Sequence, residues 1–77
     1  VLPMNTKYQS IRFNVTTRKY NPAGDLILEH NWSDEIDLVT VNRMIIDGRF
    51  KRYHTHSYVM TLDSSEGQTE YIYEKAA

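Results

Sequence analysis

The first part of the chain alternates apolar and polar residues in a way that predicts a β-hairpin. Within residues 7–20, Ile11, Phe13 and Val15 point to one side and polar residues lie between them, a period of two that is typical of a half-buried strand. Residues 21–25 follow as a turn signal, because Pro presets φ and Gly supplies a positive φ. Alternation then resumes over residues 26–32. The two runs predict an antiparallel hairpin.

Residues 33–47 support two interpretations. In the helical one, Ser33 is the N-cap, acidic residues occupy a first turn where the helix dipole favours negative charge, and Gly48 ends the helix at C′. In the strand interpretation, β-branched residues fill the run, and Asp47 with Gly48 forms a hairpin turn. We favour the helix, because start and stop signals bracket a run of helical length.

The remaining pattern predicts a second hairpin and so the fold class. Residues 49–62 form one long extended run, 63–68 a polar turn, and 69–75 a last alternating strand. We therefore expect an α+β domain of order ββαββ, a four-stranded antiparallel sheet with one helix on one face. An all-β five-stranded meander is the alternative. Residues 1–77 form a single domain, in which we expect 1–6 to be a flexible N-terminal segment and 1–3 a cloning remnant.

Composition narrows the function classes. A chain of 77 residues buries only a thin core, which favours binding over catalysis. The absence of cysteine excludes disulfides and thiol chemistry and favours a reducing, cytoplasmic location. No apolar run reaches the roughly 20 residues of a membrane span, and the three glycines lie at turns or a helix end, so no phosphate-binding loop exists. We expect no cofactor, no membrane association and no enzyme activity.

Two histidines give the one candidate metal site. On a single strand His54 and His56 share a face about 7 Å apart, and such a pair supplies two ligands where a metal site needs three or four. Ser57 lies on the opposite face of that strand, so a local Ser–His pair is not expected. The sequence therefore offers His54 and His56 only as weak metal ligands.

The tyrosines and basic residues define a candidate binding surface on the sheet face away from the helix. The chain contains six tyrosines, a residue enriched at interfaces. If Val59 and Ile72 face the helix, the opposite face presents aromatic, basic and histidine side chains together. If instead Tyr58 and Met60 face the helix, the aromatics form the core, and periodicity leaves both arrangements open. The candidate surface comprises Tyr8, Arg12, Arg18, His54, His56, Tyr58, Tyr71 and Tyr73.

These features predict a small protein-binding module: a regulator, inhibitor or accessory subunit, and a possible homodimer, with Arg12, Tyr58 and Tyr71 as contact residues. The alternative is binding of single-stranded nucleic acid across the open sheet face, where aromatic and basic groups stack bases. A net charge of −1 counts against it. A second basic cluster follows the predicted helix, where cations complement the helix dipole and leave positive charge for an acidic partner: Arg43, Arg49, Lys51 and Arg52.

Overall fold

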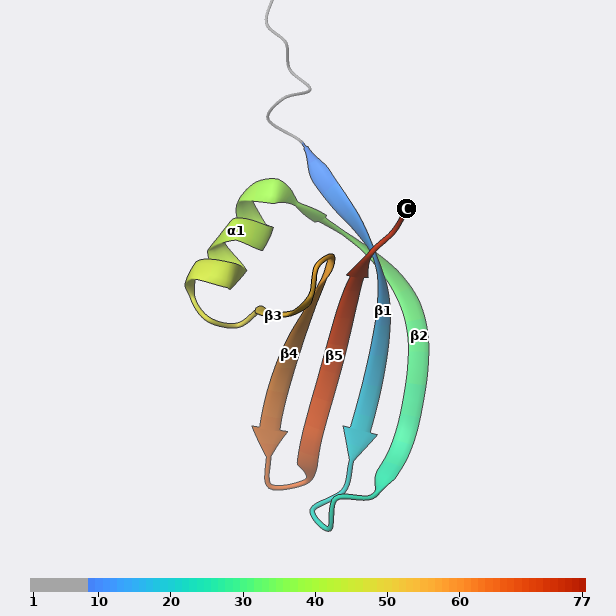
Figure 1. Cartoon of the computed structure of the whole chain (residues 1–77). Coiled ribbons are helices and arrows are strands. Elements are labelled where there is room, and N and C mark those ends of the chain that lie inside the picture. Colours follow the sequence, from blue (N-terminus) through green and yellow to red (C-terminus); the bar gives the residue numbers. More distant parts are fainter. Residues whose placement is uncertain (1–8) are drawn as a thin grey trace, which may run out of the picture.

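A computed structural model describes residues 9–77 as a five-stranded antiparallel sheet with one helix packed on one face (Figure 1). The strand order across the sheet is β2-β1-β5-β4-β3, so the first and last strands lie side by side in its centre. Tyr8 and the N-terminal segment that the sequence predicts to be flexible fall outside the described residues. The elements are β1 (Ser10–Tyr20), β2 (Leu26–Asp37), α1 (Leu38–Ile46), β3 (Lys51–His54), β4 (Ser57–Ser64) and β5 (Gly67–Lys75).

The first hairpin forms as the sequence predicts. β1 and β2 pair antiparallel from Ser10 opposite Asp37 to Tyr20 opposite Leu26. In the connecting turn the Asn21 N–H donates to the Asp25 carbonyl at 2.9 Å, and the Asp25 N–H donates to the Asn21 side-chain oxygen at 2.9 Å. Gly24 takes a φ of 90°, which explains why the turn needs glycine there.

The helix is shorter than predicted, because residues 33–37 belong to β2. Ser33 pairs with Asn14, and burial along these residues alternates with a period of two, as expected of a half-buried strand. The N-cap is therefore Asp37 and not Ser33, and no acidic residue lies in the first turn. The Thr40 hydroxyl donates to an Asp37 carboxylate oxygen at 2.5 Å. Pairing with the preceding strand of the hairpin outweighs the local capping signal.

The helix ends at the predicted glycine. Gly48 has a φ of 80°, its N–H donates to the Ile45 carbonyl at 3.1 Å, and the Arg49 N–H donates to the Met44 carbonyl at 2.9 Å. These two bonds form a Schellman motif, which satisfies carbonyls that the helix leaves free. The motif turns the chain back toward the sheet, where Phe50 is buried.

Residues 49–62 form a hairpin and not the single strand that the sequence predicts. β3 pairs with the start of β4, with a register irregularity between Arg52 and His54. Two side chains secure the turn: the Arg52 guanidinium donates to the Thr55 carbonyl at 3.1 Å, and the Ser57 hydroxyl accepts the His54 N–H at 3.1 Å. The sheet therefore has five strands, although it is not a meander, because β1 lies next to β5.

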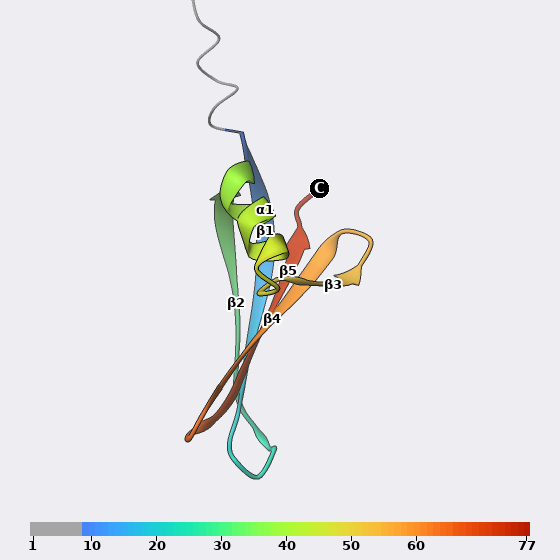
Figure 2. The ribbon, with the colours of Figure 1, turned by 90° about the vertical axis from the view of Figure 1, so that its left-hand side faces the viewer.

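Cross-strand pairing shows which face the helix covers. Residues opposite each other in an antiparallel pair share a face, so Trp32, Val15, Tyr73 and Tyr58 form one row across four strands. Figure 2 shows α1 against one end of the sheet, with the β1–β2 and β4–β5 turns at the far end. The molecule is elongated, with extents of 57 × 24 × 21 Å. The core lies at the helix end and consists of Phe13, Val15, Val41, Phe50, Tyr58 and Tyr73.

Candidate functional site

Tyrosines that the sequence places on a candidate surface belong to the covered face. Tyr58 and Tyr73 are each only 6% exposed, and Tyr71 packs partly buried against the same cluster. Phe13 meets Tyr73 edge-on with ring centroids 5.4 Å apart, and Phe50 stacks on Tyr58 at 5.4 Å. Of the two arrangements left open by periodicity, the one with the aromatics in the core is therefore present. The predicted surface of tyrosines on the open face does not form.

Burial also affects the chemistry of Tyr73. Desolvation of its phenol raises the pKa of Tyr73 above the ordinary value of 10.0, and the negative charge of Asp34 raises it further. The side chain therefore remains neutral over the physiological range. This agrees with a packing role and offers no ionised nucleophile.

The open face carries ion pairs. Arg12 lies 3.3 Å from a Glu35 oxygen, and Arg18 lies 3.5 Å from Glu29 and 3.8 Å from Glu70. Hydrogen bonds from the Ser10 hydroxyl and the Arg12 guanidinium lower the pKa of Glu35 below its ordinary value. Arg12 and Arg18 thus point to the face that the sequence predicts, but each already contacts a carboxylate.

The histidine pair does not share a strand face. His54 ends β3 and His56 lies in the turn before β4, so the spacing expected of a continuous strand does not apply. The rings of His54 and Tyr53 lie 4.3 Å apart. Within residues 9–77, no group of three or more His, Asp or Glu side chains is placed to hold a metal ion.

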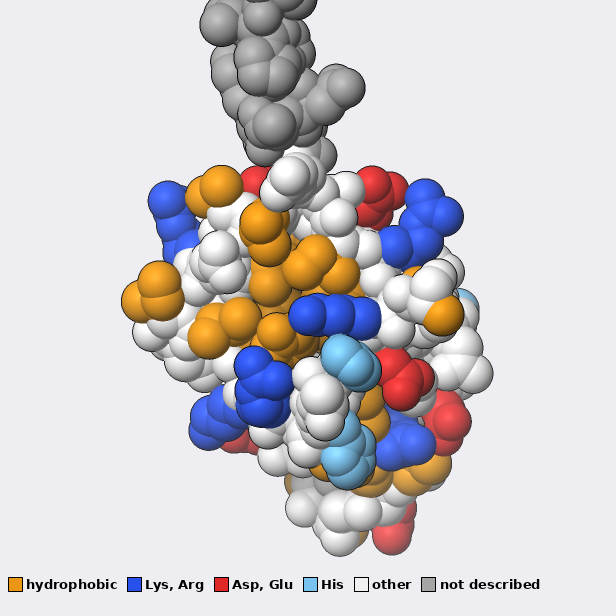
Figure 3. All heavy atoms as spheres, turned by 45° about the horizontal axis from the view of Figure 1, so that its top comes forward, with side chains coloured by type: hydrophobic (Ala, Val, Ile, Leu, Met, Phe, Trp, Pro, Cys, Tyr) orange, Lys and Arg blue, Asp and Glu red, His pale blue; other side chains and the backbone are white. Residues whose placement is uncertain are grey.

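Cations gather over the aromatic core near this turn. The Arg52 guanidinium lies 5.7 Å from the centre of the Tyr58 ring, and the Lys75 ammonium lies 5.9 Å from it, which are cation–π distances. Figure 3 looks onto this end of the molecule and shows Lys, Arg and His side chains beside a hydrophobic area. Positive charge therefore lies over the aromatic core at the helix end of the sheet.

Beyond the helix, the same sheet face is left uncovered. Two cross-strand rows of side chains lie there. Leu28 and Leu62, at the two ends of the row farther from the helix, are 51% and 53% exposed. Met60 and Tyr71 are partly buried. We call this surface the distal face; it consists of His30, Thr17, Tyr71 and Met60 in one row and Leu28, Lys19, Thr69 and Leu62 in the next.

One sheet edge carries free backbone groups. The Lys75 N–H donates to the His56 carbonyl at 2.9 Å, and backbone groups of successive strand residues point to alternate sides. Tyr58, Met60 and Leu62 therefore bond to β5, while Val59, Thr61 and Asp63 point away from it. β3 reaches only as far as Val59. Among the described residues, the backbone groups of Thr61 and Asp63 have no strand partner, and we call residues 60–64 the β4 edge.

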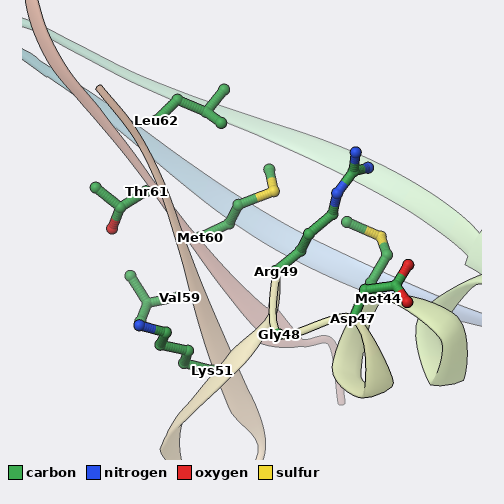
Figure 4. A pocket seen from close by; sticks show the side chains of 9 residues that line it. All are labelled: Met44, Asp47, Gly48, Arg49, Lys51, Val59, Met60, Thr61 and Leu62. Atoms are coloured by element: carbon green, nitrogen blue, oxygen red, sulfur yellow. The ribbon is translucent and has the colours of Figure 1, made fainter. Parts of the chain in front are cut away.

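A pocket surrounds the β4 edge. Its volume is about 580 Å³. Figure 4 shows Met60, Arg49 and Met44 on one side of the strand, and Val59, Thr61 and Lys51 on the other. Arg49 and Lys51 form no salt bridge within residues 9–77. The pocket thus combines free backbone groups, apolar contacts and positive charge, with Asp47 as a lining carboxylate.

Comparison with protein-family models, with curated proteins and with solved structures finds no match. No helix within the described residues is both long and apolar enough to cross a membrane.

Sequence reasoning missed the distal face and the β4 edge. It named Arg49 and Lys51 as cations near the helix end that leave charge for an acidic partner, but it did not place them beside a strand edge, and it did not separate Thr61 from the rest of a long strand. The run of Tyr58, Met60 and Leu62 at a period of two was visible in the sequence. That run was the signal for an apolar face longer than the helix can cover.

Proposed function

We propose that this chain is a small non-enzymatic binding module that acts through contact with another protein, as a regulator, inhibitor or accessory subunit. The observation that carries the proposal is the distal face. Leu28 and Leu62 are half exposed there, beside apolar groups continuous with the core. Exposed apolar surface rimmed by polar groups is typical of interaction sites.

The composition of the distal face fits a protein partner. Tyr71 offers an aromatic ring and Met60 a flexible thioether, both of which adapt to apolar side chains. Lys19 and Thr69 lie between the two leucines, and Thr17 lies between His30 and Tyr71. Protein interfaces combine apolar contacts with polar groups of this kind.

Chemical cross-linking and pull-down from the source cell test this proposal. We expect a partner to be captured by the native chain and lost with Leu28→Glu or Leu62→Glu, because a charge on either end of the distal face disfavours apolar docking. Asn14→Asp, on the open face, is the matched control and should retain the partner. Sedimentation of the purified chain shows whether the partner is a second copy. Capture that is equal for all variants would contradict the proposal.

A second candidate function is binding of single-stranded nucleic acid at the β3–β4 hairpin. The favouring observation is Tyr53, which is 54% exposed and lies beside His54 on a strand that also carries Lys51 and Arg52. An exposed ring among cations stacks bases. Fluorescence anisotropy with a labelled oligonucleotide should then show affinity that falls with added salt and with Tyr53→Ala. Capture that nuclease abolishes would favour this candidate over the first.

A further inference from the structure

We propose that the β4 edge binds an extended segment of a partner protein by β-strand addition, and that this segment alternates apolar and acidic residues. The proposal rests on the proposed function and names the chemistry of its partner. It concerns the edge of the sheet, whereas the distal face is a surface of side chains. The two surfaces share Met60 and Leu62, so Leu28, which lies only on the distal face, and the outward backbone of Thr61 are the positions that test them separately.

The backbone supplies the first part of the argument. Thr61 and Asp63 direct their N–H and C=O groups away from β5, and β3 ends its pairing at Val59. An unpaired strand edge is a template for another extended chain, whose main-chain groups complete the ladder. A strand added beside residues 60–64 would continue the sheet in line with β3.

The side chains on the two sides of this edge differ. On the helix side, Met44 and Met60 form an apolar floor, and Leu62 is 53% exposed. On the opposite side Lys51 lies next to Val59, because the two are cross-strand partners. Side chains of an added strand alternate between the two sides. Apolar residues would therefore contact the methionines, and acidic residues would lie near Lys51.

Charge complementarity favours an acidic partner over a basic one. Arg49 and Lys51 border the pocket from opposite sides of the strand (Figure 4) and neither forms a salt bridge within the described residues. Asp47 also lines the pocket, and Asp63 lies on the same side of β4 as Lys51 at the other end of the edge, so the favourable place for an acidic residue of the segment is the β3 end, beside Lys51. Such rim charges chiefly select the partner and speed association.

Titration of a fluorescent six-residue peptide that alternates valine and glutamate tests the proposal. We expect saturable binding to the native chain, and no binding of the matched peptide that alternates valine and lysine. Thr61→Pro should weaken binding at least tenfold, because proline removes the outward N–H while leaving the bonds between β4 and β5 in place. Thr61→Val keeps that N–H and should bind as the native chain does. Lys51→Glu should weaken binding several-fold.

A proline on the opposite edge of the sheet is the positional control. Ser33 lies on β2, and its backbone points away from β1 by the same alternation. Ser33→Pro should leave peptide affinity unchanged, and circular dichroism should show every variant folded. Absence of saturable binding, or equal loss with Ser33→Pro and Thr61→Pro, would overturn the proposal. Self-association of the native chain that Thr61→Pro abolishes would also overturn it, in favour of a second copy at this edge.

The outcomes separate this inference from the function on which it rests. If Leu28→Glu removes a captured partner while the edge variants retain it, and the native chain binds no peptide, the module function holds and strand addition fails. If no variant affects any captured partner but the acidic peptide binds at Thr61, the distal face is not the interface. Both results are read on the same set of purified chains.

Discussion

The two ends of the sheet share a face but differ in what covers it. At the helix end, Phe13, Tyr58 and Tyr73 are buried beneath α1 and the chain that follows it. At the distal end, Leu28 on β2 and Leu62 on β4 lie on the same sheet face and are half exposed. The same alternation of residues thus produces core at one end and free surface at the other. Side-chain packing is therefore concentrated at the helix end, and the exposed side chains of the distal end are free to change with little cost.

The strongest test of this comparison is to truncate one apolar side chain at each end. Phe13→Ala should lower the free energy of unfolding by about 3–5 kcal/mol, because Phe13 is fully buried and leaves a cavity. Leu28→Ala should change it by about 0.5 kcal/mol or less, as an exposed substitution does. Urea denaturation measures both. Equal losses would show that the distal end is as tightly packed as the core.

Two glycines extend the test to the backbone. A Cβ at Gly67 would lie 1.9 Å from the Tyr20 carbonyl oxygen, and its φ is 125°, whereas a Cβ at Gly48 would meet open space at a φ of 80°. Gly67→Ala should therefore lower the free energy of unfolding by about 3 kcal/mol, because backbone strain and a clash with the Tyr20 carbonyl both destabilise the folded chain. Gly48→Ala should cost about 1 kcal/mol. Thermal unfolding of the pair in parallel checks the order, and a reversed order would contradict it.

The unfolding free energy at alkaline pH tests the aromatic core through the ionisation of Tyr73. Because burial raises the pKa of Tyr73 above 10.0, the folded chain holds this proton more tightly than the unfolded chain. The corresponding stability is full below pH 10 and is lost as pH rises through the folded value. Tyr73→Phe should flatten this part of the curve of unfolding free energy against pH. An unchanged slope in the variant would assign the effect to another group.

Acidic pH probes the open face and should give the smallest effect. The pKa of Glu35 is lowered by hydrogen bonds from Ser10 and Arg12, so its contribution is present above the ordinary value of 4.5 and fades as pH falls through the folded value. The pair is exposed, so added salt should weaken the effect. Comparing Glu35→Gln with the native chain at low and high salt measures it. If Glu35→Gln lowers the free energy of unfolding equally at low and high salt, hydrogen bonding to Glu35 outweighs its charge interaction with Arg12.

The features predicted correctly from the sequence are those that depend on neighbouring residues in the chain. The turn at Gly24 and the helix end at Gly48 follow from backbone freedom that glycine alone provides, and the alternation of β1 follows from burial on one side. The helix start was misplaced because Ser33 resembles an N-cap, whereas the first hairpin extends further than its alternation indicated and pairs Ser33 with Asn14.

The candidate site depended on contacts that periodicity cannot supply. Alternation places Tyr58 and Val59 on opposite faces of the sheet but does not show which face the helix covers. The register of β4 on β5 determines that Tyr58 lies on the covered face. The residues around Thr55 continue the extended pattern and carry no turn signal, so the sequence predicted His54 and His56 on one strand. The free backbone of Thr61 became visible only when β3 proved to be short.

The central position of β1 beside β5 has a consequence for how the chain folds. Each hairpin closes a short loop, β1 with β2 and β4 with β5, and can therefore form quickly. The sheet is complete only when the first strand meets the last, which closes a loop of nearly the whole chain and bears the largest entropy of closure. A covalent link between the two ends of the chain should therefore speed folding.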